Sequence, residues 1–436
     1  MDVLLSILGI LVVALGIGIS IGLHELGHFY PARKFGVFVG KFMVGFGPTL
    51  WSRKFGETEF GIKAIPLGGY VSLSGMYPPT PSTNRGFKLF RSLVQDARDA
   101  SAETITDENR TFYKLGTFKR IVIMLGGPVM NLLIAAVLYV VLFSGFGVMA
   151  PTTAVGSLAD CVKPVTAVDQ TCTDADPVAP AKAAGLVVGD TIVSIDGVPF
   201  TDWVSNISII RDHPNDTIEF VIDRAGKTLT LAVVPVEAER YVFDTDGNAV
   251  TNEDGSLKTD VVGYAGVGPE YARQRQSPVV ALQNLGTNIV DVGGIIIDLP
   301  ARMGQVWDAA FGSAERDVNG PVSVVGVGRI AGEVASLDGI DIASRVSALI
   351  GILASLNVAL FVFNLIPLLP LDGGHVAVAL IDWVRGRFAK LFGRPAPQPI
   401  DTARLVPITV VATAILIAMS ALLIYADIVK PITLGP

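Results

Sequence analysis

The sequence predicts a polytopic α-helical membrane protein that also carries a small β-sheet and one compact α+β domain. Of its 436 residues, 50% are hydrophobic and only 17% are charged, which is too apolar a composition for an ordinary soluble protein. Four segments without Asp, Glu, Lys or Arg are long enough to cross a bilayer as helices. These four predicted transmembrane segments lie at residues 3–23, 121–150, 346–371 and 405–426.

The first apolar segment could instead be a secretory signal peptide. Its start, MDVLL, contains the acidic Asp2 and lacks the basic residues that precede a signal-peptide core. The segment also lacks a small-residue cleavage site and runs directly into His24. We therefore expect it to be a retained transmembrane helix.

The distribution of charge predicts the orientation. Lys and Arg gather in residues 31–119 and again in residues 376–404, whereas residues 151–300 are acidic. Because positively charged loops stay in the cytoplasm, the two basic segments are predicted inside and the acidic one outside. With four crossings, both termini then lie outside. The basic residues adjoin the predicted membrane boundaries and indicate contact with lipid, not a nucleic-acid partner.

The predicted domain organisation follows from these segments and from the composition of the chain between them. It comprises transmembrane helix 1 (residues 1–30), a cytoplasmic β-sheet with a membrane hairpin and connector (31–119), transmembrane helix 2 (120–150), an extracytoplasmic β-rich domain (151–240), an extracytoplasmic region of amphipathic helices (241–344), transmembrane helix 3 (345–375), a cytoplasmic loop (376–404) and transmembrane helix 4 (405–428).

Residues 37–75 alternate between apolar and polar side chains and contain turn signals such as KFGE, which predicts a small β-sheet. Residues 64–84 carry no charge, but their prolines and glycines exclude a spanning helix. This segment either dips into the membrane under the cover of other protein or forms an apolar surface hairpin. Residues 85–118 are polar and predict a connector with one short amphipathic helix.

The extracytoplasmic domain is predicted from residues 153–238. The sequence KAAGLVVGDTIVSIDGVPF predicts a short helical turn, a strand and a hairpin turn at Asp196 and Gly197. Two further strands are expected in TIEFVIDRAGKTLTLAVV. The segment resembles a PDZ domain, in which an extended peptide adds as a strand, here at the loop before Gly185. His213 falls in this domain and is expected on its surface.

Cys161 and Cys172 are the two cysteines of the chain, and both fall in the predicted outer segment. They are either two free thiols or a disulfide. An even number of cysteines confined to the oxidising side of the membrane favours the disulfide, which would stabilise the domain by roughly 2–3 kcal/mol.

Beyond residue 262, apolar residues recur at alternating spacings of three and four, which is typical of an amphipathic helix. The stripe consists of Leu282, Leu285, Ile289, Val292, Ile296, Leu299, Met303 and Val306. Asp291 and Asp298 argue against a fifth transmembrane helix. We expect breaks at Gly293 and Pro300, and helices that lie on the outer surface.

Two histidines stand four residues apart in the sequence GLHELGHF, at the end of the first apolar segment. On a helix this spacing turns His24 and His28 to the same side, with Glu25 beside them. In the HExxH arrangement, two neutral imidazoles bind zinc and a carboxylate activates water. The alternative is a polar cluster without a metal. Because His and Glu are costly at the membrane, the functional interpretation is favoured.

A third metal ligand is predicted in the sequence NLIPLLPLDGGH, where Asp372 is the only acidic residue. A catalytic zinc site needs three protein ligands and an open position for water. The predicted orientation directs the first and third helices inward, so His24, His28 and Asp372 are expected at the same membrane face. Asp372 could also cap the helix that follows it, and the two roles are compatible.

The HELGH and NLIPLLPLDGG sequences together resemble the paired signatures of the site-2 protease family of intramembrane zinc metalloproteases. The similarity covers nearly the whole chain and includes IPLGGY, GGPVMN and NGPVSVVG. The single PDZ-like domain, the sequence GETEFGIKAIPLGGY and the two cysteines are more similar to the actinobacterial branch of the family.

The resemblance implies that one Zn²⁺ ion is bound by His24, His28 and Asp372 and that Glu25 is the general base. His375 follows the third ligand too closely to bind the same ion easily, so we expect it near the metal without contact.

The same resemblance implies a substrate-binding strand at Gly68, Gly69 and Tyr70. A helix hides its carbonyl groups in hydrogen bonds, so the scissile segment must unwind and be held extended before attack. Asn364 would steady the substrate backbone or the oxyanion. Asn131, in GGPVMN, would either support the site or pack two helices together.

The implied function is regulated intramembrane proteolysis in a bacterial cytoplasmic membrane. Substrates would be single-span membrane proteins, such as anti-sigma factors or signal-peptide remnants, after a first extracytoplasmic cut. The alternative is a catalytically silent membrane PDZ scaffold, against which the complete HExxH and Asp372 weigh. The PDZ-like domain would either filter substrates by size or capture a new C-terminus. Its acidic composition disfavours a carboxylate ligand, so we expect the filter.

Overall fold

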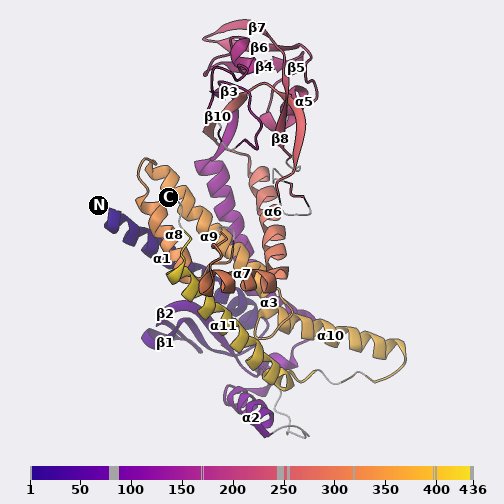
Figure 1. Ribbon diagram of the computed structural model, residues 1–436. Coiled ribbons are helices and arrows are strands. Elements are labelled where there is room, and N and C mark those ends of the chain that lie inside the picture. The colour runs from indigo at the N-terminus through magenta and orange to yellow at the C-terminus, as the bar shows by residue number, and fades with distance from the viewer. Residues whose placement is uncertain are drawn as a thin grey trace. The chain divides into compact units, whose positions relative to one another are not determined.

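The computed structural model places residues 2–77, 88–167, 169, 171–242, 250–252, 256–317, 320–395, 397 and 400–432, and the description that follows is limited to them (Figure 1). The chain forms two compact units. The helical unit comprises residues 1–146 and 276–436, and the β-rich unit comprises residues 147–275. The end of the apolar segment 64–84 and most of the acidic loop after residue 242 lie outside the described residues.

Within the described residues, five helices are long and apolar enough to cross a membrane. Four of them coincide with the predicted transmembrane segments. These are α1 (Asp2–Lys34), α3 (Thr117–Val140, continued by the π-helical turn η3, Val141–Phe146), α9 (Ile342–Asn364) and α11 (Val406–Val429, preceded by the 3₁₀ turn η4, Thr402–Leu405). The fifth is α6 (Pro278–Ile297), which belongs to the predicted amphipathic stripe.

The helix α6 packs by one face on α3 and α9, and Ala281 and Leu285 are its two buried residues. Its buried residues Ala281 and Leu285 contact Tyr139 of α3 and Val358 of α9 in one apolar cluster. The helix ends at Ile297 and α7 (Leu299–Phe311) follows, so the break comes after the two glycines, not at them. Asp291 stays exposed, so α6 packs on α3 and α9 without burying this carboxylate.

The next helix, α8 (Val324–Ser336), packs against α1 and α9. Val327 and Ala331 of α8 share an apolar cluster with Val13 of α1 and Leu349 of α9. Ser323 caps its first turn, and the Ser323 N–H donates to the buried Asp427 carboxylate of α11 at 2.6 Å. The same carboxylate accepts from Arg316 at 2.9 Å. A buried polar cluster therefore joins α11 to the start of α8.

The predicted small sheet is a long antiparallel hairpin, formed by β1 (Val39–Phe55) and β2 (Thr58–Leu73). Its base packs on the ends of two long helices. Val39 and Leu73 of the hairpin are buried in one cluster with Ala32 of α1 and Ile123 of α3. This cluster holds the hairpin beside the HExxH segment.

Polar elements complete the helical unit. The predicted connector helix is α2 (Lys88–Glu103), followed by the 3₁₀ turns η1 (Glu108–Arg110) and η2 (Phe112–Lys114), and α10 (Asp372–Leu391) follows α9. Arg98 of α2 forms an ion pair with Asp401, and Arg120 of α3 forms one with Asp382 of α10. The second pair attaches α10 to α3.

The β-rich unit contains one larger sheet and one two-stranded sheet. Its elements are β3 (Val148–Leu158), α4 (Pro180–Ala183), β4 (Thr191–Ile195), β5 (Val198–Pro199), α5 (Trp203–Arg211), β6 (Ile218–Arg224), β7 (Lys227–Val233), β8 (Val236–Tyr241), β9 (Thr259–Tyr264) and β10 (Val267–Gln274). The larger sheet has the order β10-β3-β4-β6-β7, with β5 beside β4, and β8 pairs with β9.

Several local predictions for this unit are confirmed. Asp196 and Gly197 both have positive φ in the turn between β4 and β5, and the hairpin β6–β7 closes between Arg224 and Lys227. The core contains Ile192, Phe220 and Ile222 of these strands. The predicted peptide-receiving loop before Gly185 differs, because the short helix α4 occupies this position and offers no strand edge.

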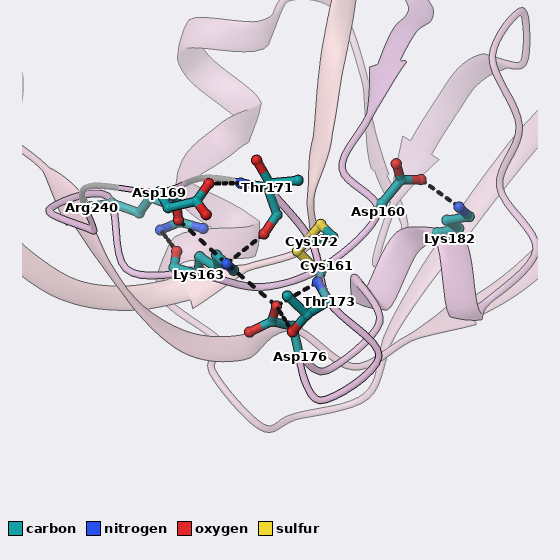
Figure 2. Close-up of a disulfide and its surroundings, with 10 residues drawn as sticks. All are labelled: Asp160, Cys161, Lys163, Asp169, Thr171, Cys172, Thr173, Asp176, Lys182 and Arg240. Atoms are coloured by element: carbon teal, nitrogen blue, oxygen red, sulfur yellow. Dashed lines mark hydrogen bonds and ion pairs between the residues drawn. A yellow bond between two sulfur atoms is a disulfide. The ribbon is translucent and has the colours of Figure 1, made fainter.

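Cys161 and Cys172 are joined by a disulfide (Figure 2). The loop that it closes folds around the Lys163 side chain, whose ammonium group donates to the Thr171 carbonyl at 2.6 Å. The Asp176 carboxylate lies 3.4 Å from the same nitrogen. The Lys163 carbonyl in turn accepts a hydrogen bond from Arg240 at 2.8 Å. The loop is thus attached to the end of β8 as well as to itself.

A buried ion pair leads to a prediction for the stability of the β-rich unit. Asp190 is fully buried and accepts two hydrogen bonds of 2.7 Å from Arg224, which hold the pKa of the Asp190 carboxyl below its usual value. A carboxyl whose pKa is lower in the folded state than in the unfolded state stabilises the fold at pH values above its unfolded-state pKa, roughly 3.9. This stabilisation is lost as the pH falls through the folded pKa.

We expect Asp190→Asn to speed amide hydrogen exchange in β4 and β6 of the detergent-solubilised protein at pH 7. The difference from the parent should shrink as the pH approaches 3. Asp196→Asn is the control, because Asp196 is exposed in a turn that Asn also tolerates. Equal exchange at pH 7 in the parent and in Asp190→Asn would contradict the prediction.

Candidate active site

The two histidines of HELGH lie on the same side of α1, four residues and one helical turn apart. Their Nε2 atoms are 3.2 Å from each other. The Asp372 carboxylate lies 3.4 Å from the Nε2 atom of His24 and 3.4 Å from that of His28. The structure therefore brings together the three residues that the sequence predicts as metal ligands.

Asp372 reaches the histidines because α9 ends before it and α10 begins at it. The helix α9 ends at Asn364, and Leu371 occupies the N-cap position of α10 without a side-chain capping bond. Asp372 is then the first residue of α10. Its carboxylate points to the histidines, so the alternative role of helix cap is not the one it takes here.

The helix α3 lies behind both imidazoles. His28 donates from Nδ1 to the Ile123 carbonyl at 2.7 Å, and the Asn131 amide nitrogen lies 3.0 Å from Nδ1 of His24. Gly127 lies between Ile123 and Asn131 on α3. A Cβ atom on Gly127 would lie 2.3 Å from Nε2 of His28 and 2.6 Å from Nε2 of His24. The site therefore needs a residue without a side chain at this position.

Glu25 is buried, with 8% of its surface exposed. Strand β2 lies against it, because a Cβ atom on Gly69 would be 2.8 Å from the Glu25 Cγ atom. Gly69 pairs with Val44 and Tyr70 with Met43 of β1. The predicted substrate-binding strand and the predicted general base are therefore neighbours.

The other predicted site residues are placed as follows. Asn364 ends α9 and forms no hydrogen bond with the three clustered residues in the described part of the chain. His213 is exposed, as expected, and its Nδ1 lies 2.8 Å from the Ile209 carbonyl. His375 lies in the first turn of α10 and is half-buried.

Sequence reasoning missed Ile123 and Gly127. Ile123 acts through its carbonyl, which no side-chain pattern reveals. Gly127 belongs to the GGPVMN sequence, where two consecutive glycines inside an apolar helix are a signal of close helix packing.

The cluster fits a zinc ion. Two imidazole nitrogens and one carboxylate oxygen are a catalytic zinc set that leaves one position open. Ligand bonds of about 2.0–2.1 Å in a tetrahedron separate the donor atoms by roughly 3.3 Å. The observed separations of 3.2, 3.4 and 3.4 Å match this edge length. The hydrogen bond from His28 Nδ1 to Ile123 also directs the Nε2 lone pair to the common point.

The position of Gly127 leads to a second prediction. We expect Gly127→Ala to abolish stoichiometric zinc in the purified protein, because the added methyl group would occupy the space of both Nε2 atoms. Zinc content per chain measured by mass spectrometry after extensive dialysis is the readout. Gly116→Ala is the matched control, since Gly116 precedes the same helix and its Cβ would meet nothing within 4 Å. Full zinc in Gly127→Ala would contradict the geometry.

Comparison with known proteins agrees with the site. Residues 12–406 match the model of peptidase family M50. The chain is 33% identical over 436 residues to the zinc metalloprotease Rip1 of Mycobacterium tuberculosis, which covers 99% of this chain and 100% of the relative. It is 32% identical over 443 residues to the protein of the same name in Mycolicibacterium smegmatis, with 98% of each chain covered. The chain therefore belongs to peptidase family M50, is similar to its actinobacterial members, and is an intramembrane zinc metalloprotease.

Proposed function

We propose that the protein cleaves single-span membrane proteins in regulated intramembrane proteolysis, with His24, His28 and Asp372 as zinc ligands and Glu25 as general base. The observation that carries the assignment of residues is the set of three donor atoms at tetrahedral spacing. Glu25 stands next to His24 on the same helix and is buried beside a strand. No other described residues form a His, Cys, Asp and Glu cluster of this kind.

Each group in the site has a separate role in the proposed reaction. Zinc supplies Lewis-acid activation of water and of the scissile carbonyl. The Glu25 carboxylate accepts the proton of the attacking water and then passes it to the leaving amine. The Ile123 carbonyl holds the proton of His28 on Nδ1, so that Nε2 stays a ligand. Burial of Glu25 excludes bulk water from this proton transfer.

We assign the substrate strand to residues 68–70. Among the described residues, strand β2 pairs with β1 alone, so an extended substrate can add to the hairpin as a further strand. Because Gly69 lies against Glu25, a strand added here would pass close to the general base. Asn364 lies at the end of α9. The resemblance of the chain to the family assigns this residue to binding the oxyanion or the substrate backbone.

Asn131 is assigned the role of holding His24. The Asn131 side chain is fully buried and its Oδ1 atom has no hydrogen-bond partner among the described residues. Amide oxygen and nitrogen atoms are placed by their surroundings and can be exchanged by a flip of the amide group. A zinc ligand at His24 Nε2 needs the proton on Nδ1. An amide flip lets the oxygen of Asn131 accept that proton and removes the unpaired buried oxygen.

The proposed topology has four full crossings, by α1, α3, α9 and α11, with both termini and the β-rich unit outside. The acidic composition of residues 151–300 and the basic residues on the other side support this orientation. The helix α6 is also long and apolar enough to span a membrane, but it carries Asp291 and is not assigned a crossing, which keeps the number of crossings even. The β-rich unit is assigned as a PDZ domain and the membrane as the bacterial cytoplasmic membrane.

The proposed substrates are anti-sigma factors or signal-peptide remnants that a first protease has trimmed outside the membrane. This assignment follows the resemblance to the family. The scaffold alternative is not retained, because the relatives are zinc metalloproteases and the metal cluster is complete.

The general base is tested by Glu25→Gln. We expect this variant to bind one zinc ion per chain, as the parent does, and to lose cleavage of a single-span substrate by a factor of about 10² or more. Zinc content and gel-based cleavage in detergent measure the two properties. Cleavage at the parental rate would show that another residue moves the proton.

The role of Asn131 is tested by two substitutions. We expect Asn131→Leu to weaken zinc binding by about 10- to 100-fold in competition with a chelator, because a lost partner of a ligating histidine typically has this effect. Asn131→Asp presents only oxygen acceptors and should bind zinc nearly as tightly as the parent. Equal loss in both variants would contradict acceptance by Asn131, since an amide donor would then be required.

A further inference from the structure

The helix α10 has an apolar side that stays exposed in the helical unit. It consists of Leu380, Trp383, Val384, Phe388, Leu391 and, in the turn that follows the helix, Phe392. Spacings of three and four residues direct these side chains to one side of α10. Their exposed fractions lie between 41% for Val384 and 76% for Leu391. We call these six residues the apolar sector.

The opposite side of α10 is held by the rest of the helical unit. Val378 and Ala379 are buried, and the Asp382 carboxylate pairs with Arg120 of α3 at 3.4 Å. Asp382 also accepts a hydrogen bond of 2.8 Å from the N–H group of Ile400. These contacts fix the rotation of α10 about its own axis. The apolar sector therefore stays on the outside of a helix that extends sideways from the helical unit (Figure 1).

Basic residues flank the apolar sector on both sides. By helical position, Arg385 lies at one border, and Arg387 and Lys390 lie at the other. Asp382 is the one acidic residue between residues 373 and 400, and its carboxylate belongs to the packed side. Arg387, Lys390 and Arg394 form no ion pair with a described residue. The charge next to the apolar sector is therefore positive and is not neutralised within the described chain.

An anionic lipid surface matches this combination of apolar sector and bordering cations. The apolar side of an interfacial helix enters the boundary between headgroups and acyl chains, and long basic side chains reach the phosphates from its borders. Trp383 is of the residue type enriched at this level, and the Arg387 guanidinium lies 5.1 Å from the centre of its ring. The segment is also attached to the membrane at both ends, because α10 lies between two helices that are long and apolar enough to cross it, α9 and the helix at Thr402–Val429.

We propose that α10 lies in the cytoplasmic headgroup layer of an anionic bilayer, with the apolar sector among the acyl chains and Arg387 and Lys390 on lipid phosphates. The cytoplasmic leaflet supplies the negative surface. Asp372 is the first residue of this helix, so lipid on one side and α3 on the other hold the carboxylate beside the two histidines. Anionic lipid therefore stabilises the zinc site. The proposal rests on the proposed function in two respects, namely that Asp372 binds zinc and that α10 is cytoplasmic.

The position of α10 is measured by the fluorescence of Trp383 in the full-length protein in lipid nanodiscs. Trp51→Phe and Trp307→Phe remove the other two exposed tryptophans, and Trp203 is buried. We expect phosphatidylglycerol brominated close to the headgroup to quench Trp383 about twofold more than the same lipid brominated near the chain ends. Trp383→Phe is the control and should abolish this difference. Absence of quenching would place the apolar sector in water or against protein, and stronger quenching from the chain ends would make α10 a crossing helix, so either result overturns the proposal.

The role of charge is tested by the rate at which a chelator removes zinc from the protein in nanodiscs. We expect the parent to lose zinc about fivefold more slowly when roughly one third of the phosphatidylcholine is replaced by phosphatidylglycerol. Arg387→Glu with Lys390→Glu should abolish this difference between the two lipid mixtures. Lys227→Glu with Lys258→Glu makes the same change of charge at two exposed positions of the β-rich unit and should keep it. A difference that persists in Arg387→Glu with Lys390→Glu would contradict the proposal.

The two readouts separate this inference from the proposed function. Quenching of Trp383 depends on neither zinc nor cleavage, so it reports on the position of α10 alone. If Asp372→Ala keeps stoichiometric zinc, the ligand assignment is wrong and the coupling of lipid to the zinc site falls with it. If Asp372→Ala loses zinc but the parent loses zinc equally fast in both lipid mixtures, the ligand assignment stands and the proposed coupling is overturned.

Discussion

The backbone contact between α1 and α3 is the constraint on which the metal site depends. Gly27 and Gly126 face each other so closely that a Cβ atom on Gly126 would lie 1.9 Å from the Gly27 carbonyl oxygen. This approach brings the Ile123 carbonyl to His28 and the Asn131 amide to His24. In an apolar environment, small residues at a helix interface permit van der Waals contact between backbones. The helix α3 can then act as the support of two imidazoles without contributing a metal ligand.

The third ligand depends on a separate set of contacts. Asp372 begins α10, and α10 is held to α3 by the ion pair between Asp382 and Arg120. The same helix α3 therefore supports the ligands on α1 and positions the helix that carries the third. Metal binding is coupled to packing in such an arrangement, because the donor atoms converge only when both helices are in place. Zinc should accordingly stabilise the packing of α1, α3 and α10 together.

The proposed substrate strand would place peptide recognition next to the zinc chemistry within the helical unit. In the helical unit, β2 lies beside Glu25 and offers a strand edge close to the general base. Addition of a strand acts through the backbone of an extended ligand and depends on its conformation more than on its sequence. An enzyme that must accept unwound transmembrane segments of varied sequence has a use for recognition of this kind.

The residues of the proposed metal site and most of the helices could be predicted from the sequence. The spacing of His24 and His28, the lone acid Asp372 and the apolar lengths were enough, because metal ligands and membrane spans depend on side-chain type and period. The contacts that hold these residues in place are seen only in the folded chain. A carbonyl such as that of Ile123 has no sequence signature, and the apolar period of α6 indicates its packing face but not that α3 and α9 are its partners.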